Sequence, residues 1–378
     1  MWRFILVVSL LCWGSEGSVT CRDNNNGAVD WFILYKVPRL EPHTPTGLEY
    51  LYIDSNSNGV TTMVPPKPPH KLINHPNGVL ANTLRPLFTP IRSMPQDFGF
   101  ISYSDQPPGC HASDSFGHSK GVLMVTKTGT GVWLLHSTPQ FPFRRDQNHF
   151  WPNSGARNAQ MFICVTFPYD QFRHIGSHLQ YIRAFPFEHD VPLDFHHELR
   201  DAVNWAQLPP PNNMRLLRSS GNKAFHSIAK QESDQPRVGD LYVTIAQEVD
   251  SDLDVQTWGC QAGRKPSYCV RGIHKVFNIK TVKTDLGDWE STRDHSKWCV
   301  AKSQNNHWTC IADVNRAETQ YKRRGGALCI QDEKIKRVFL QFAGGTEDCS
   351  TQNIINTGCD ADSDTHMTDI VPDPSRMG

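Results

Sequence analysis

One local pattern occurs twice in this chain, and this repetition constrains the fold more than any other feature. Residues 118–120 read His-Ser-Lys and precede an apolar strand, a polar turn and a second strand that carries Trp133. Residues 295–297 also read His-Ser-Lys and precede the same succession, with Trp308 in the second strand. The two histidines are separated by 295 − 118 = 177 positions, about half of the 378 residues. A duplicated unit with one His-x-Lys motif in each half is the simplest explanation.

Apolar runs around the two motifs predict buried strands, because they are short, β-branched and aromatic. Strands are expected at 29–37, 99–104, 161–167, 239–246 and 270–279, hairpins at 121–137 and 298–314, and a helix at 170–182. Residues 208–213 (LPPPNN) suit neither a helix nor a central strand and mark the expected boundary between the halves. The sequence therefore predicts an α/β protein with two pseudo-repeated halves, 18–207 and 208–359, each a mixed β-sheet with flanking helices. Residues 360–378 are expected to form a loose acidic tail.

The first seventeen residues are expected to be a signal peptide. Arg3 supplies a positive charge, residues 4–13 are apolar, and Ser15 and Gly17 are small residues before the expected cleavage site. No later stretch approaches the eighteen apolar residues of a membrane span. The sequence thus predicts an exported, soluble chain.

Ten cysteines remain after removal of the signal peptide, and an even number in an oxidising compartment favours disulfides. The chain has no CxxC pair, so a structural zinc site is not indicated. It also has no Asn-x-Ser/Thr sequence, so glycan-dependent sorting to lysosomes has no acceptor site.

The charge balance excludes a constitutively basic nucleic-acid binder, since 38 basic residues face 38 acidic ones. The 17 histidines change this balance in acid. Most of them become protonated below a pKa of about 6.5, which gives a net charge of roughly +15 near pH 5. Such a chain suits a polyanionic substrate in an acidic compartment.

Two His-x-Lys motifs suit the hydrolysis of a phosphodiester. Residues i and i+2 of a strand share a face, so His118 converges with Lys120, and His295 with Lys297. If the halves pack about a pseudo-twofold axis, both pairs meet at one active site at their interface. One neutral imidazole then attacks phosphorus, the other donates a proton, and the lysines balance the phosphate charge. This chemistry requires no metal and no cofactor.

Other residues near the motifs have two open interpretations. His136 lies at the end of a strand after the first motif and either lines the same pocket or is an ordinary buried histidine. Either Asn315 contacts phosphate or orients a motif residue and Arg316 neutralises backbone phosphate, or both residues belong to a polar strand end. Trp298 and Trp308 are interpreted as core residues rather than base-stacking platforms.

At these residues the sequence resembles the deoxyribonuclease II family of acid endonucleases. The resemblance rests on segments in order along the chain: 29–38, 104–108, 117–123, 131–142, 164–168, 294–300, 308–316 and 324–329. It implies phospholipase D-like halves, with His118 as the nucleophile and His295 as the acid. It also implies metal-free cleavage of DNA in acid, 3′-phosphate and 5′-hydroxyl ends, and digestion of DNA from dying or engulfed cells, mainly in lysosomes.

The cysteine pairing can be stated only in part. The resemblance favours Cys21 with Cys164 and Cys269 with Cys349. A Cys310–Cys329 bond would close a loop that holds the basic run Lys322, Arg323 and Arg324 near the second motif, where these three residues are candidates for DNA-phosphate binding. The partners of four cysteines stay open: Cys110, Cys260, Cys299 and Cys359.

The sequence departs from the phospholipase D pattern at one point. The expected Asp four residues after each motif lysine is replaced by Met124 and Ala301, so its supporting role is vacant or filled from elsewhere. Two alternatives to an acid endodeoxyribonuclease remain: a phospholipid phosphodiesterase of the same superfamily, and a catalytically silent, secreted DNA-binding protein. Oligomeric state, and lysosomal against secreted location, are left open.

Overall fold

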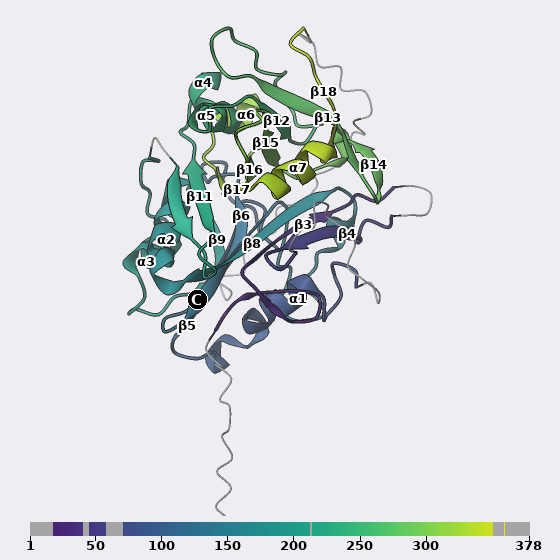
Figure 1. Ribbon diagram of the computed structural model, residues 1–378. Helices are drawn as coiled ribbons and strands as arrows, with labels where there is room; N and C mark the ends of the chain where they lie inside the picture. The colour runs from purple at the N-terminus through teal and green to yellow at the C-terminus, as the bar shows by residue number, and fades with distance from the viewer. Residues whose placement is uncertain (1–17, 41–44, 58–70, 212–213, 351–358, 360–378) are drawn as a thin grey trace, which may run out of the picture.

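The computed structural model describes residues 18–40, 45–57, 71–211, 214–350 and 359 (Figure 1). The expected signal peptide, the tail 360–378 and part of the boundary 208–213 lie outside the described residues. Among the described residues, no helix has the length and apolar character needed to cross a membrane.

The first half forms a seven-stranded sheet, drawn in the lower part of Figure 1. Its spatial order is β4 (Tyr50–Asp54), β3 (Trp31–Lys36), β8 (Gln160–Pro168), β7 (Thr130–His136), β6 (Lys120–Thr126), β5 (Phe98–Ser104) and β9 (Pro186–Asp190). The described pairs of this sheet are all antiparallel, whereas a mixed sheet was expected. Short turns such as Thr126 to Thr130 explain the difference, because tight hairpins join only antiparallel neighbours.

The second half forms a nine-stranded sheet with one parallel pair, β12 with β13. Its main path is β10 (Arg215–Arg218), β11 (Ala224–Ala229), β17 (Gly326–Gln331), β16 (Trp308–Ala312), β15 (Trp298–Ala301), β12 (Leu253–Gln256), β13 (Val276–Thr284) and β14 (Gly287–Glu290), with β18 (Ala343–Thr346) paired to β13. A separate small sheet joins β1 (Cys21–Arg22) to β2 (Ala28–Val29).

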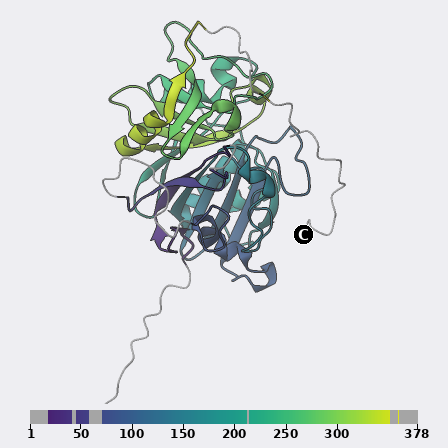
Figure 2. The ribbon, with the colours of Figure 1, turned by 90° about the vertical axis from the view of Figure 1, so that its right-hand side faces the viewer.

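The two sheets face each other across a shared apolar core, with helices between and outside them (Figures 1 and 2). Residues Ile33 and Tyr35 of β3 enter the shared core, while the alternate residues Phe32 and Leu34 enter a core on the outer face. The helices are α1 (Val79–Leu84), α2 (Phe172–Tyr181), α3 (His197–Val203), α4 (Pro236–Gly239), α5 (Leu241–Glu248), α6 (Glu318–Tyr321) and α7 (Glu333–Phe342). Apolar residues of α2, α3 and α7 belong to the shared core, those of α1 to the outer core of the first sheet, and those of α5 to the outer core of the second.

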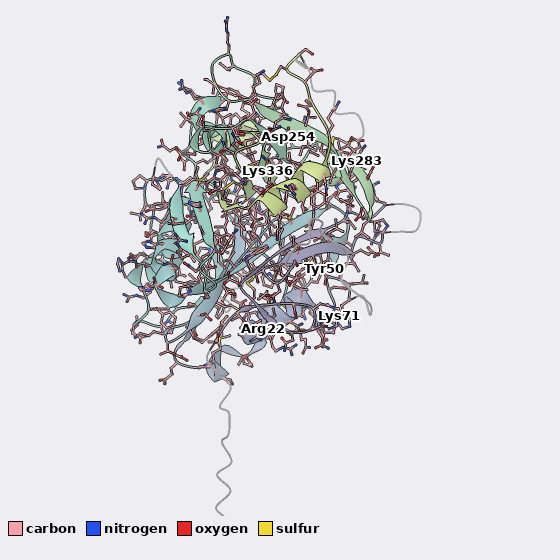
Figure 3. The ribbon with its side chains drawn as sticks, viewed as in Figure 1. Arg22, Tyr50, Lys71, Asp254, Lys283 and Lys336 are labelled. Carbon is pink, nitrogen blue, oxygen red and sulfur yellow. A yellow bond between two sulfur atoms is a disulfide. The ribbon has the colours of Figure 1, made fainter. Side chains whose placement is uncertain are left out.

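Two charged side chains of the second half that Figure 3 labels, Asp254 and Lys336, have their partners within that half. Asp254 on β12 accepts a hydrogen bond from Lys302 at 2.8 Å, and Lys336 on α7 donates to the backbone oxygen of Ser303. Tyr50, in contrast, lies on β4 in the first half.

Most of the predicted elements are confirmed. Strands β3, β5 and β8, the hairpins β6–β7 and β15–β16, and helix α2 all lie where the apolar pattern places them. Of the strand expected at 270–279, only the end from Val276 onward is a strand. The duplication itself stays a prediction.

The strand expected at 239–246 is wrong, because this segment forms helix α5. Asp240 caps the helix by accepting a hydrogen bond from the backbone N–H of Tyr242 at 3.0 Å. A short apolar run has no clear period, so a buried helix and a buried strand look alike in sequence.

Four disulfides are present among the described residues. Three confirm the expected pairs Cys21–Cys164, Cys269–Cys349 and Cys310–Cys329, and the fourth joins Cys260 to Cys359. The remaining two cysteines, Cys110 and Cys299, are free thiols, so the even number did not yield five bonds.

Candidate active site

Each His-x-Lys motif is tied to the opposite half of the protein. The backbone N–H of His118 donates to the oxygen of Arg324 at 2.9 Å, and that of His295 donates to the oxygen of Ala159 at 3.0 Å. Both histidines precede their strands rather than lying on them, since β6 begins at Lys120 and β15 at Trp298. The contact with the other half, rather than a shared strand face, therefore orients each motif.

Of the two ring nitrogens of His118, Nδ1 forms a hydrogen bond with the second half, whereas Nε2 does not. Its Nδ1 lies 2.6 Å from the backbone oxygen of Asp313, which can only accept a hydrogen bond. Nδ1 therefore carries the proton in the neutral ring, and Nε2 carries the lone pair. The carboxylate of Asp105 lies on the Nε2 side of the ring, with Oδ2 at 3.8 Å.

Asp105 connects the two halves beside His118. This carboxylate is 4% exposed and binds Lys120 of the first motif and, at 3.2 Å, Arg323 of the second half. Burial alone would raise the pKa of Asp105, but the charges of His118, Lys120 and Arg323 outweigh burial and hold it well below its usual range. Asp105 is thus ionised in mild acid as well as at neutral pH, and supports Lys120 where the expected Asp after the motif is missing.

His295 lies in a closely packed pocket. The ring of Trp258 covers it with centroids 4.4 Å apart, and no polar group of the described chain bonds its buried Nε2. Asn315 accepts a hydrogen bond from the backbone N–H of Trp258 at 3.1 Å. Asn315 therefore positions Trp258, which covers His295, and a role of Asn315 in the pocket stays a prediction.

The residue before His295 anchors the second motif. Asp294 is fully buried and accepts hydrogen bonds from Trp289 Nε1 at 2.7 Å and from the backbone N–H of Ser296 at 2.8 Å. The hydroxyl of Tyr35, on β3 of the first half, also donates to Asp294. These bonds fix the backbone on both sides of His295.

Buried lysines give the site a positive potential. Burial, with the neighbouring charge of Lys120 acting in the same direction, lowers the pKa of Lys297 to about 7. Burial likewise lowers the pKa of Lys36 to about 7. The pKa values of His118 and His295 lie well below 6.5, first because both rings are buried and then because Lys120 and Lys297 act on each of them. The two motifs thus influence one another electrostatically, and an anion is what this arrangement favours.

Asp313 is a second buried acid beside His118. Its Oδ2 accepts a hydrogen bond from the N–H of Gly326 at 3.0 Å, while Oδ1 is buried without a partner in the described chain. Burial raises the pKa of Asp313 to about 8, although Lys120 and Lys297 oppose the shift. The carboxyl group is therefore neutral in acid.

His136 lies deep in the first half. Its ring is 1% exposed and packs on Phe162 and Phe141, with centroids 5.5 and 4.9 Å away. Burial lowers its pKa well below 6.5, and Lys120 lowers it further. Neither ring nitrogen has a partner in the described chain. This placement makes His136 a neighbour of the first motif, and a role in the pocket stays a prediction.

The four candidate phosphate-binding residues lie in different settings. Arg316 is 1% exposed and pairs with Asp240 at 2.9 Å, so it is a structural cation and not part of a DNA surface. Arg323 and Arg324 are partly buried and paired, whereas Lys322 is 60% exposed. Arg316 is therefore excluded as a ligand of DNA phosphate, because its buried guanidinium is already paired with Asp240 inside the second half.

No group of three or more metal-ligating side chains occurs in the residues that the structure describes. Trp298 is fully buried, as expected, and Trp308 is partly buried against His226.

Sequence reasoning missed four residues of the site: Lys36, Asp105, Trp258 and Asp313. Lys36 had a usable signal, since it is a charge inside a run of buried strand residues. Asp105 and Asp313 each follow the end of a strand, β5 and β16. Trp258 has no comparable signal, because its contact with His295 exists only in the folded chain.

Comparisons with known proteins show the family of this chain. A family model described as Deoxyribonuclease II matches residues 20–349. Human deoxyribonuclease-2-beta is 33% identical over 88% of this chain and 92% of its own length. Porcine (Sus scrofa) deoxyribonuclease-2-alpha is 33% identical over 92% and 95%, and plancitoxin-1 of Acanthaster planci is 31% identical over 92% and 97%.

Solved structures are more distant. Yeast tyrosyl-DNA phosphodiesterase matches at a TM-score of 0.29 and 9% identity, over 57% of this chain and 67% of its own. Phosphatidylserine synthase of Haemophilus influenzae matches at a TM-score of 0.32 and 9% identity, over 62% and 63%.

Proposed function

Because this chain belongs to the deoxyribonuclease II family, we propose that it is an acid endodeoxyribonuclease that hydrolyses DNA phosphodiesters without a metal. The observation that carries the proposal is the pair of His-x-Lys motifs, each held by the opposite half of the chain. Two imidazoles and two lysines then act on one phosphate.

In the first step, Nε2 of His118 attacks phosphorus and the bond from phosphorus to O5′ breaks. This assignment is supported by the hydrogen bond from Nδ1 to the backbone of Asp313, which leaves the Nε2 lone pair available. Protonated His295 donates its proton to the departing O5′. The products of this step are a 5′-hydroxyl end and a 3′-phosphohistidine.

In the second step, neutral His295 removes a proton from water, and the water oxygen attacks phosphorus. The bond from phosphorus to Nε2 breaks, which regenerates neutral His118 and leaves a 3′-phosphate end. His295 is protonated again and ready for the next cycle. Lys120 and Lys297 balance the negative charge on the non-bridging oxygens throughout.

The requirement for acid follows from the burial of the histidines. The free protein holds both imidazoles neutral, because burial and the two lysines lower their pKa values. A bound phosphate opposes this effect and raises the pKa of the imidazole that must be protonated. Activity therefore requires a low pH together with bound substrate.

The acid requirement of the two histidines also favours a particular cellular compartment. Export through the secretory pathway, with disulfides and a pH optimum in acid, suits a lysosome, a phagolysosome or an acidic extracellular space. DNA from dying or engulfed cells is the substrate that such a place supplies. The lack of a glycosylation sequence favours either secretion or a glycan-independent route to lysosomes.

A plasmid-nicking assay across pH 4–8, with and without EDTA, tests the proposal. We expect a bell-shaped profile with an optimum near pH 5, a steep loss by pH 7.5 that is greater at high salt, and no effect of EDTA. Inhibition by EDTA that magnesium restores would overturn the metal-free mechanism.

Two further outcomes would replace the proposal with one of its alternatives. Hydrolysis of phosphatidylcholine without cleavage of DNA would indicate a phospholipid phosphodiesterase. DNA binding without cleavage at any pH would indicate a silent binding protein.

A further inference from the structure

An aromatic cluster lies beside the first catalytic motif. The rings of Phe116 and Phe185 meet edge to face with centroids 4.8 Å apart, and Trp205 packs on both at 5.6 and 6.1 Å. Phe116 is 9% exposed, whereas Trp205 is 52% exposed. The cluster thus presents one large aromatic ring to solvent on a buried aromatic base.

The cluster is connected directly to the catalytic centre. Phe116 precedes His118 by two residues, and its backbone oxygen accepts a hydrogen bond from Arg323 at 3.0 Å. The same guanidinium binds Asp105, the carboxylate that holds Lys120. An exposed ring therefore stands within a few residues of the place where the scissile phosphate binds.

The backbone at this place is strained. Trp205 and Arg183 have φ angles of 62° and 49°, a region that bulky residues rarely adopt. Conformations of this kind persist only where the surrounding structure holds them, and they gather at functional sites. Here the N–H of Trp205 donates to the oxygen of Ala202 at 3.1 Å, which ends helix α3 and turns the indole toward Phe116.

The charge around Trp205 suits a nucleic acid. The guanidinium of Arg183 lies over the ring of Phe116, 5.3 Å from its centroid. The ion pairs found in the described part of the chain include none with Arg183. Its Nε donates to the side-chain oxygen of Gln207 at 3.1 Å, a neutral partner that leaves the positive charge uncompensated. A charged guanidinium next to an exposed indole is the combination that binds a phosphate and the base attached to it.

We propose that Trp205 forms a base-stacking subsite for the DNA substrate, with Arg183 beside it, next to the scissile phosphate. This inference rests on the proposed function. A base can stack on the indole only when it leaves its neighbours in the duplex, so the subsite favours unpaired or extruded nucleotides and shows little sequence preference.

The test compares two single-stranded oligonucleotides that differ only in whether the nucleotides carry bases or are abasic. For Trp205→Ala, we expect KM for the normal oligonucleotide to rise about tenfold with kcat unchanged, because stacking contributes to binding. Cleavage of the abasic oligonucleotide should be the same in the variant and the wild type. Trp205→Phe should retain most of the affinity, and Leu193→Ala, which removes an apolar side chain that is 83% exposed, is the matched control.

A second measurement covers the case in which Trp205→Ala does not fold. In a His118→Ala background, which binds without cleaving, the oligonucleotide should quench part of the tryptophan fluorescence, and Trp205→Phe should remove that part. Unchanged quenching, or equal KM values for both oligonucleotides in wild type and variant, would overturn the subsite. Failure of the proposed function looks different, since the wild type would then cleave neither oligonucleotide.

Discussion

The Nδ1 atom of His118 lies 2.6 Å from the backbone oxygen of Asp313, 195 residues further along the chain. The second half of the protein therefore sets the orientation and the tautomer of the histidine in the first half. In the other motif it is the backbone that crosses between the halves, since the N–H of His295 donates to the oxygen of Ala159. The candidate active site exists only when the two halves are packed together.

Removing either imidazole is expected to abolish cleavage. His118→Ala loses the nucleophile and His295→Ala loses the acid, and a two-step path requires both. DNA binding should largely persist, because the lysines remain. Plasmid nicking and a filter-binding assay at pH 5 measure the two effects, with His274→Ala, a partly exposed histidine paired with Asp250, as the control. More than a tenth of wild-type activity in His118→Ala would exclude it as the nucleophile.

The two motif lysines are expected to contribute less than the histidines. Lys120→Ala and Lys297→Ala each remove one charge from the phosphate, which should lower kcat by about 10²- to 10³-fold. Single-turnover kinetics separate this loss from weaker binding. A loss below tenfold would mean that Lys36 or Arg323 carries the charge balance instead.

Asp105→Asn should destabilise the fold as well as the site. The substitution leaves Lys120 and Arg323 without their buried carboxylate, and breaking such a pair costs about 3–5 kcal/mol. Urea unfolding at pH 7 measures the change in the free energy of unfolding. The exposed acid Asp146 supplies the control, since Asp146→Asn should change stability by less than about 1 kcal/mol. Equal stability of the two variants would show that Asp105 does not anchor the motif.

Burial of His178 predicts a loss of stability in acid. Its ring lies 5.2 Å from that of Trp133, and burial lowers its pKa from 6.5 to about 3. A lowered pKa means that the unfolded chain binds the proton more tightly, so stability is complete above pH 6.5 and falls as the pH drops toward 3. At pH 5 the loss from this residue is about 2 kcal/mol.

The variant His178→Phe isolates this effect. Asp313 has the opposite effect: its pKa is raised to about 8, so it stabilises the folded protein as the pH falls from 7.5 to 5. This contribution is the same in the wild type and in the variant. Urea unfolding at pH 7.5 and pH 5 should show a smaller loss for His178→Phe than for the wild type. Parallel losses in the two proteins would contradict a buried, neutral His178.

The Cys310–Cys329 bond should contribute measurably to stability. It joins positions 19 residues apart on neighbouring strands, β16 and β17, and the entropy of closing such a loop is worth roughly 3 kcal/mol. Replacement of both cysteines by serine should lower the free energy of unfolding by about that amount, while Cys110→Ser, at a free thiol, should change it little. Peptide mapping without reduction checks the pairing directly, and a free Cys310 thiol would refute it.

The sequence by itself determined the local elements and the chemical groups of the site. The apolar runs placed β3, β5 and β8, and the repeated His-x-Lys motifs indicated four candidate site residues, because both signals lie in short stretches of chain. The segment 241–248 could not be assigned from the local pattern, since its helix depends on the cap from Asp240 and on burial of its apolar residues in the outer core of the second half.

The tertiary structure alone decided how these groups are held. Asp105 came to support Lys120, and Arg316 turned inward to Asp240, through contacts between positions 15 and 76 residues apart. Trp258 reached His295, and Asp313 reached His118, by the same kind of long-range packing. No local pattern encodes such neighbours, because the energy of a buried charge or ring depends on every group that surrounds it after folding.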